Sequence, residues 1–418
     1  MGQTERGTGR WTFRPPAWTA SPASVAILLL LAVLVALSVG CDDLEEQSED
    51  LPSLATGDDD DGEFVLDGNG AYDVSEPWDY PYYLVIGGAL SETLSLATVS
   101  GPGEISVAND VQLTGSAINQ MQTHDGALYA VCSLSHSVIR YDTSSLAIRS
   151  ETSLGVGTNP LEIAFADDGR AFVSNFVTND MRVFDLGEGD DPLSVIDMPK
   201  DDLPRYEGAG ETWARPGSIR YFDGAVFMAL SNLDEQFRAG GPGVVAVVDA
   251  DGQALVDTIE MTGGNTTALH LDRDARRLYA MSTGTYDNDE GFIGDGRVDV
   301  IDVDSRAVVD TVEIGGAPFT MVQNPRGVAY LGNGQHAVVL SFDTETMEVR
   351  EPIDIRDGDD GDGLGLSYAS GIATDGNGYL YVVDFNHDEL VVIDTFNGDR
   401  VIARVTVNDG PVPIGFIR

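Results

Sequence analysis

The side chains best suited to acid–base or metal chemistry lie in the last third of the sequence. Near neutral pH an imidazole can act as a general base or a metal ligand, and carboxylate and amide oxygens can bind divalent cations. The candidates are His336, His387, Asp384 and Asn386. No serine-nucleophile, zinc-protease, haem-attachment or phosphate-loop motif accompanies them. Exposed or turn-bonded histidines are the alternative interpretation, so we expect binding rather than catalysis and leave enzymatic activity open.

Two acidic loops have the composition of a calcium site. Carboxylates that alternate with glycine can surround a hard divalent cation such as Ca²⁺. The candidate ligands are Asp287, Asp289 and Asp295 in one loop and Asp357, Asp359 and Asp362 in the other. Neither loop has the spacing of an EF-hand. Ca²⁺ is therefore the one candidate cofactor, and the alternative is that both loops are solvated acidic segments.

Basic and aromatic residues gather between positions 200 and 238, where Lys200 is the only lysine of the chain. Guanidinium groups bind carboxylates and phosphates, and aromatic rings provide platforms for cations and sugars. The predicted binding residues are Arg205, Tyr206, Trp213, Arg215, Phe237 and Arg238. Nearby acids such as Glu211 and Asp234 leave a second interpretation, in which the bases form only local ion pairs.

The N-terminal forty residues read as an export signal. Three arginines precede an apolar run over 25–39, which at about fifteen residues is shorter than the roughly 20 that span a membrane. Gly40 followed by Cys41 resembles the end of a bacterial lipoprotein signal, although Ser38 and Val39 depart from its usual residues. We expect lipid attachment at Cys41, with a differently processed signal anchor as the alternative. The protein would then be exported and held at the cell envelope by its lipid.

Charge and composition divide the chain into three parts. Residues 1–40 form the predicted signal, residues 41–78 an acidic segment expected to be a disordered tether, and residues 79–418 a single large β-domain. The formal net charge is −46, with 69 acidic and 23 basic residues. Such a surface repels nucleic acid and anionic lipid, so we expect no nucleic-acid partner and membrane contact through the lipid alone. We interpret the charge as an adaptation to salty surroundings, with a specific cationic partner as the alternative, and we expect a monomer.

A unit of roughly 40 to 50 residues recurs along the predicted domain. Each copy contains an apolar strand, a turn, an aromatic strand, a third strand that ends near Asp, and a fourth strand. The aromatic positions are Tyr83, Tyr129, Phe172, Phe227, Tyr279, Tyr330 and Tyr381. The aspartates are Asp142, Asp185, Asp249, Asp302, Asp343 and Asp394. Their first expected role is structural, since a side-chain oxygen can cap the turn into the outer strand.

Seven units of four strands, without helical periodicity, predict an all-β fold, a single seven-bladed β-propeller of four-stranded antiparallel blades. The closing sequence "GPVPIGFIR" looks like the innermost strand of the blade that contains Tyr83. Pairing of the two terminal segments in one blade would close the ring.

The repeats resemble the YVTN family of bacterial propeller repeats. The resemblance is clearest from Asn159-Pro160 into "IAFADDGRAFVSN" and over Asp375–Val382, and it covers nearly the whole predicted domain. The family's Pro-Asp-Gly turn is Asp-Asp-Gly at 167–169. The resemblance implies the propeller fold but no particular activity, because such repeats encode blade packing and known members include enzymes and binding proteins.

Four insertions interrupt the regular spacing of the units. In an antiparallel blade, the second-to-third connection and the link to the next blade emerge on one face. The insertions 199–216 and 356–369 join blades, whereas 232–243 and 283–296 join second to third strands, so all four are predicted on that face. Because function concentrates in elaborated loops on a rigid scaffold, we expect the binding surface there, with neutral loop growth as the alternative.

Two functions remain consistent with these observations. The first is a lipid-anchored, non-enzymatic scaffold that binds an envelope protein, peptide or saccharide through the inserted loops. The second is a hydrolase or lyase, such as a lactonase, with a divalent cation in the central funnel. Its ligands would be the polar residues that follow second strands, Asn175, Asn232, Asn333, Asp384 and Asn386.

Overall fold

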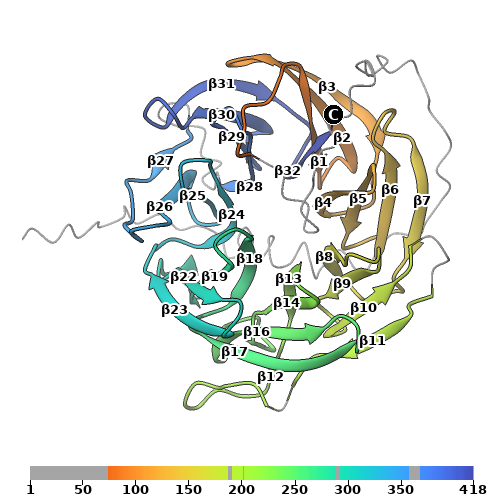
Figure 1. The fold of residues 1–418 in the computed structure, drawn as a ribbon, viewed down its shortest axis with the longest axis vertical. Coiled ribbons are helices and arrows are strands. Elements are labelled where there is room, and N and C mark those ends of the chain that lie inside the picture. The colour runs from red at the N-terminus through yellow and green to blue at the C-terminus, as the bar shows by residue number, and fades with distance from the viewer. Residues whose placement is uncertain (1–73, 187–190, 201, 288–290, 357–367, 418) are drawn as a thin grey trace, which may run out of the picture.

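A computed structural model describes residues 74–186, 191–200, 202–287, 291–356 and 368–417 of the 418. Every regular element in these ranges is a β-strand, and the strands form a ring of blades around a central axis (Figure 1). No helix within the described ranges is long and apolar enough to cross a membrane. The predicted signal over 1–40 and Cys41 lie outside these ranges, and the predicted domain boundaries stay predictions.

The first three blades are regular four-stranded antiparallel sheets. From the axis outward, blade one contains β32 (Pro411–Ile417), β1 (Tyr82–Gly88), β2 (Thr93–Gly101) and β3 (Glu104–Leu113). Blade two contains β4 (Ile118–His124), β5 (Ala127–Cys132), β6 (Ser137–Asp142) and β7 (Ile148–Ser153). Blade three contains β8 (Pro160–Phe165), β9 (Ala171–Asn175), β10 (Asp180–Phe184) and β11 (Ser194–Asp197).

The other four blades follow the same order, and two of them carry an extra two-stranded ribbon. Blade four contains β13 (Pro216–Phe222), β14 (Ala225–Leu230), β16 (Pro242–Asp249) and β17 (Ala254–Gly264), and blade five β18 (Thr266–Asp272), β19 (Arg277–Ser282), β22 (Arg297–Asp302) and β23 (Ala307–Val312). Blade six contains β24 (Pro318–Gln323), β25 (Val328–Asn333), β26 (Val338–Asp343) and β27 (Ile353–Asp354), and blade seven β28 (Ala369–Thr374), β29 (Tyr379–Asp384), β30 (Glu389–Asp394) and β31 (Arg400–Thr406). The ribbons are β12 (Thr212–Trp213) with β15 (Leu233–Asp234), and β20 (Tyr286–Asp287) with β21 (Gly291–Phe292). The prediction of seven four-stranded blades is confirmed.

The repeated aromatic residues lie on the second strand of every blade. Phe172, Tyr279 and Tyr381, for example, are fully buried within β9, β19 and β29. Apolar side chains from facing sheets meet in seven clusters, one between each pair of neighbouring blades. Burial of apolar area between the sheets therefore holds the ring together. Cys132 belongs to this core, where burial raises the pKa of its thiol to about 11.

The predicted turn caps are present in the described turns. Asp142 Oδ1 accepts the backbone amides of Ser144 and Ser145 at 3.1 Å, and Asp343 Oδ1 accepts those of Glu345 and Thr346 at 3.0 and 2.8 Å. Asp249, Asp302 and Asp394 cap the corresponding turns of their blades. These aspartates are thus structural, because their oxygens satisfy amides that the tight turns leave without strand partners.

The two ends of the propeller close the ring within blade one. β32 pairs antiparallel with β1, with Tyr83 opposite Ile417, as the sequence predicts. Trp78, just before β1, is buried edge-on against Phe416, with ring centroids 4.8 Å apart. Its backbone amide donates to Asn377 Oδ1 of blade seven at 3.0 Å. Contacts across the junction therefore involve both the strand ladder and the residues that precede it.

The two faces of the ring differ in which connections they carry. In every blade, an amide of the second-to-third connection donates to the carbonyl of a residue just before the innermost strand, at 2.9 to 3.4 Å. The pairs are Ala89 with Gly410, Ser133 with Ala117, Phe176 with Asn159, Asn232 with Ala214, Thr283 with Asn265, Gly334 with Ala317, and Phe385 with Tyr368. Both kinds of connection therefore lie side by side on one face, here called the insertion face. The opposite side, with the short turns, is called the turn face.

Candidate functional site

All four predicted insertions belong to connections of the insertion face. Two of them are joined beside blade four by strand pairing and hydrogen bonds. β12 from the segment that joins blades three and four pairs with β15 from the second-to-third connection of blade four, Trp213 opposite Leu233. Asn232 Nδ2 donates to the carbonyls of Pro204 and Pro242 at 2.7 and 2.8 Å. In Figure 1 the segment that carries β12 lies at the rim of the ring, outward of β17. The two insertions thus form one structural unit.

Close backbone contact explains a glycine in this unit. A Cβ atom at Gly241 would lie 2.0 Å from the Pro204 carbonyl oxygen and 2.6 Å from Asn232 Nδ2. Only glycine leaves room for the two insertions to approach this closely.

The guanidinium group of Arg215 lies among three aromatic rings of this part of the structure. Its guanidinium carbon lies 5.0 Å from the ring centroid of Phe237, 5.3 Å from that of Phe176 and 5.6 Å from that of Trp213. These distances are in the range of cation–π attraction. We call Arg215 and these three rings the arginine cage. The structure brings together three of the six predicted binding residues here and adds Phe176.

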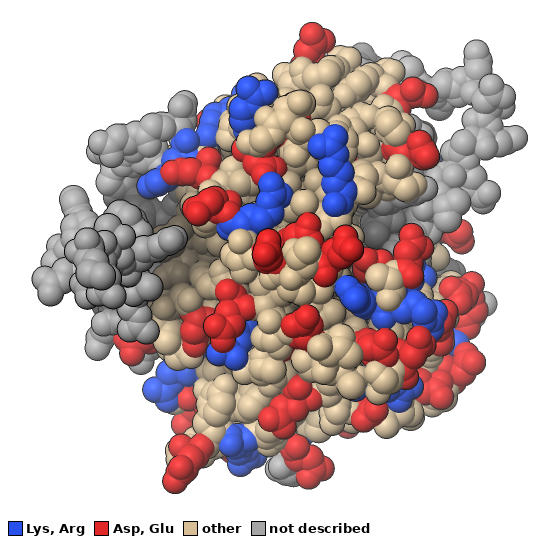
Figure 2. All heavy atoms as spheres, turned by 60° about the vertical axis from the view of Figure 1, so that its left-hand side comes forward, with Lys and Arg blue, Asp and Glu red and all other residues tan. Residues whose placement is uncertain are grey.

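The other predicted bases are mostly paired with acids. Arg238 makes two hydrogen bonds to Asp234 Oδ2, at 2.8 and 3.0 Å, and Lys200 Nζ lies 2.7 Å from Glu211 Oε1. Arg205 and Tyr206 are exposed, and the Tyr206 amide donates to the Gly240 carbonyl. For Arg238 and Lys200 the geometry agrees with local ion pairing. Figure 2 shows the same mixture of acidic and basic side chains on the side of the molecule that it presents.

Three buried polar atoms of the unit formed by the two insertions have no hydrogen-bond partner. They are Arg215 Nε, Thr212 Oγ1 and Asn232 Oδ1, and the side chains of Thr212 and Asn232 have no exposed surface. The Asn232 amide donates to Ala214 and the Ser231 amide to Arg215, so these residues lie close together. Buried polar groups without partners are uncommon in folded proteins and call for an explanation such as a bound ligand or water.

The acidic loops give a partial answer to the calcium hypothesis. Asp295 accepts the Thr285 amide at 2.7 Å and its hydroxyl at 2.8 Å, so its carboxylate stabilises the loop around β20 and β21. Asp287 is an exposed residue of β20. The other four predicted ligands, Asp289, Asp357, Asp359 and Asp362, lie outside the described residues. Within the described ranges, no group of three or more metal-ligating side chains is arranged to hold a metal ion.

His336, Asn386 and His387 lie in second-to-third connections on the insertion face, and Asp384 is the last residue of β29. His387 Nδ1 is 3.1 Å from Oδ2 of the buried Asp384, and the Asn386 amide donates to Asp384 Oδ1 at 3.3 Å. A carboxylate in this position orients an imidazole. His336 occupies the corresponding connection of blade six and is exposed. The structure therefore pairs His387 with Asp384 by direct contact.

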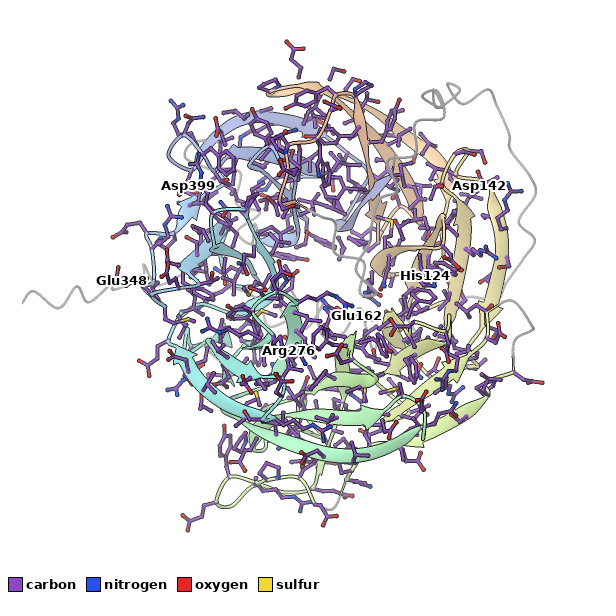
Figure 3. All side chains as sticks on the ribbon, in the orientation of Figure 1. His124, Asp142, Glu162, Arg276, Glu348 and Asp399 are labelled. Carbon is purple, nitrogen blue, oxygen red and sulfur yellow. The ribbon has the colours of Figure 1, made fainter. Side chains whose placement is uncertain are left out.

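Charged residues beside the central axis were not found by sequence reasoning. Figure 3 shows Glu162 near the axis, whereas Asp142 and Glu348 lie at the periphery. Glu162 Oε2 accepts the Ser218 hydroxyl at 2.7 Å and the Ile219 amide at 3.0 Å, and forms an ion pair with Arg220 Nη1 at 2.6 Å. The signal that could have found them is a glutamate on one predicted innermost strand and an arginine on the next, two positions further along its strand.

Phe176 was missed as well. It directly follows Asn175 in the second-to-third connection of blade three and is buried. Its position shortly after a second strand, on the face with the insertions, was the available signal. Sequence spacing alone could not show that its ring meets Arg215, which lies 39 residues further along the chain.

The fold and the site define a seven-bladed β-propeller with elaborated loops on one face. No family model and no curated protein sequence matches the chain. A solved structure titled Kuenenia stuttgartiensis hydrazine synthase is similar, with a TM-score of 0.54 and 19% identity over 71% of this chain and 87% of that chain. Dihydro-heme d1 dehydrogenase NirN in complex with DHE gives 0.49 and 16%, covering 79% and 74%. At 19% identity, the likeness to hydrazine synthase concerns the fold alone.

Proposed function

We propose that this protein is a lipid-anchored propeller of the cell envelope that binds an envelope protein, peptide or saccharide through its insertion face, without catalysing a reaction. One observation carries the proposal, namely that the connections with insertions belong to one face and that the two insertions beside blade four are tied to each other by β12, β15 and Asn232. A rigid ring that presents stabilised loops on one side is suited to recognition, since little ordering entropy is lost on binding.

Exposed apolar side chains on the same face support this function. Val156 is 96% exposed between Gly155 and Gly157, in the segment that joins blades two and three. Ile293, next to β21, is 53% exposed. Leu90, Val177 and Tyr206 are also exposed in connections of this face. Apolar groups at the tips of loops provide the contact area that a partner can bury.

Site-specific photo-crosslinking in cells tests the binding function. A photoreactive residue at Val156 or Ile293 should give a discrete cross-linked product, whereas one at Thr143 or Asp168 in turns of the turn face should not. Equal labelling from both faces, or none from the insertion face, would contradict the proposal. The anchor is tested separately, because Cys41→Ser should release the protein from the membrane fraction, and retention would refute lipidation at this residue.

A hydrolase or lyase with a divalent cation is the second candidate. The observation that favours it is the contact between His387 and the buried Asp384 on the insertion face. Turnover of a lactone that requires Ca²⁺ and is abolished in both His387→Gln and Asp384→Asn would support this reaction and overturn the non-enzymatic role. Turnover that survives both substitutions would exclude the pair as its catalytic residues.

A further inference from the structure

We propose that the arginine cage is a binding site for a carboxylate carried on an apolar or aromatic stem. The inference rests on the proposed function and names the chemical class of its ligand. Four observations at Arg215 carry it: three surrounding rings, no acidic partner, an unpartnered Nε atom, and a backbone held in place by neighbouring residues.

The rings come from three separate connections of the insertion face. Phe176 belongs to blade three, Trp213 to β12 and Phe237 to the second-to-third connection of blade four. Phe176 is buried, whereas Trp213, Phe237 and Arg215 are each partly exposed. The cage is therefore apolar at its base and open to solvent at its rim. A carboxylate on an apolar stem could meet the guanidinium while its stem contacts the rings.

Arg215 has no carboxylate within ion-pairing distance among the described residues, although the sequence has 69 acids. Nearby bases do have one: Arg182 pairs with Asp180, Lys200 with Glu211 and Arg238 with Asp234. The contacts of the Arg215 side chain are the rings and a long hydrogen bond from Nη1 to the Phe176 carbonyl, at 3.4 Å.

A partly buried guanidinium without a counterion is electrostatically unfavourable. Burial lowers the pKa of Arg215, as expected when the charged form loses hydration without gaining an anion. The buried Nε has no acceptor. A carboxylate that accepts two parallel N–H bonds would satisfy the guanidinium and supply the missing charge.

The backbone of Arg215 is fixed before any ligand arrives. Its φ angle is 53°, in the left-handed region that a non-glycine residue adopts only with support. Its amide donates to Asn179 Oδ1 at 3.0 Å, and its carbonyl accepts the Ser231 amide at 3.3 Å. The backbone that carries the side chain is thus held by residues of blades three and four, which reduces the entropy lost on binding.

The overall charge favours a monoanion over a phosphate. Repulsion from a protein of net charge −46 grows in proportion to ligand charge, so a dianion is excluded more strongly than a carboxylate. The apolar rim adds contact area that inorganic phosphate cannot use. An acidic or C-terminal carboxylate next to an apolar side chain fits both conditions.

Calorimetric titration of the full chain with phenylacetate and with its neutral isostere phenylacetamide tests the proposal. Phenylacetate should bind, phenylacetamide at least about tenfold more weakly, and inorganic phosphate more weakly than phenylacetate. Phenylacetate should also change the emission of Trp213, measured as the difference between wild type and Trp213→Phe. Equal binding of phenylacetate and phenylacetamide, or no binding of phenylacetate, would overturn the proposal. If inorganic phosphate bound more tightly than phenylacetate, the proposed carboxylate ligand would be wrong and the site would be specific for phosphate.

Two variants place the site at the cage. Arg215→Gln should reduce phenylacetate affinity at least about tenfold, whereas Arg326→Gln should leave it unchanged. Arg326 is a matched control because its guanidinium lies 3.8 Å from the Phe396 ring centroid on the turn face. Unchanged affinity in Arg215→Gln would contradict the site, and the comparison of the two wild-type ligands remains decisive if that variant fails to fold. If phenylacetate binds but Val156 and Ile293 give no cross-links, the carboxylate site at the arginine cage is supported and the binding function of the insertion face is refuted. If cross-links form but phenylacetate does not bind, the binding function is supported and the carboxylate site is refuted.

Discussion

Glu162 Oε2 lies 2.6 Å from Arg220 Nη1 and joins the innermost strands of blades three and four. The same oxygen accepts the Ser218 hydroxyl and the Ile219 amide. The carboxylate is partly buried and serves three donors of the neighbouring strand, so its charge and geometry both contribute to the contact between blades.

Glu162→Gln should lower the melting temperature, with a loss of about 1 to 2 kcal/mol in the free energy of unfolding, because the neutral amide forms weaker hydrogen bonds and leaves Arg220 without its counterion. Thermal unfolding followed by circular dichroism measures the effect. Glu348→Gln removes the same charge from an exposed position at the periphery (Figure 3) and should be nearly neutral. Equal effects of the two substitutions would contradict this role of Glu162.

His270 should make stability depend on pH. Burial, and secondarily the charge of Arg220, lowers the pKa of His270 on β18 to about 4. In the unfolded chain this imidazole has a pKa near 6.5, so between about pH 6.5 and 4 the unfolded state binds a proton that the folded state does not. The free energy of unfolding therefore falls as the pH decreases through this range. The slope from this residue is at most about 1.4 kcal/mol per pH unit.

The comparison of wild type with His270→Asn isolates this effect from the titration of the many carboxylates. The stability of wild type relative to the variant should decline as the pH is lowered through this window, as measured by chemical denaturation at each pH. Parallel pH profiles for the two proteins would show that His270 does not titrate in this way.

The junction of blades one and seven should open more readily when Tyr82 is changed to Phe. Tyr82 and Tyr381 both donate to the buried Asp375 Oδ2, the latter at 2.9 Å. Loss of one hydroxyl leaves this buried carboxyl with fewer donors, at a cost of about 1 to 3 kcal/mol.

Hydrogen exchange followed by mass spectrometry locates the change. Peptides that cover β1, β32 and β29 should exchange faster in Tyr82→Phe, whereas those that cover β14 and β16 on the other side of the ring should not change. Uniform acceleration across all blades would indicate global destabilisation and would contradict a local junction effect.

The aspartate that caps each outer turn should be replaceable by asparagine but not by alanine. Asp343 Oδ1 accepts two backbone amides and the Thr346 hydroxyl. Asp343→Ala should cost about 0.5 to 1 kcal/mol, and Asp343→Asn should cost less because its amide oxygen still accepts the backbone amides. The melting temperatures of the two variants test this prediction. A larger decrease for Asp343→Asn than for Asp343→Ala would mean that the negative charge, and not the hydrogen bonds to the turn, stabilises this site.

Salt should stabilise the protein. The net charge of −46 produces repulsion within the folded molecule, and at 1 M ionic strength the screening length falls to about 3 Å. The melting temperature should therefore rise steadily between about 0.05 and 1 M NaCl. Potassium chloride should act in the same way, because the effect depends on ionic strength. A decrease with either salt would indicate that local ion pairs outweigh long-range repulsion.

The sequence by itself determined the number of blades, the role of the capping aspartates and the closure of the ring. Each of these depends on local periodicity. An aromatic residue in every second strand and Asp after the third strand repeat at regular intervals, and apolar packing between similar units admits few arrangements. The closing strand at the end of the chain, left over after the repeats are counted, indicates where the ring closes. Antiparallel order then assigns each connection to a face, so the location of the four insertions also followed from counting strands.

Only the tertiary structure decided which polar and aromatic side chains meet. Arg215 and Phe176 come from different blades, and the pairing of Arg238 with Asp234 depends on the conformation of one loop. Residues on separate connections meet through the path of each loop and the rotation between blades, neither of which has a periodic signal. The ring can be predicted from the sequence because its blades repeat. The arginine cage cannot, because it is formed once, by contacts between segments far apart in the chain.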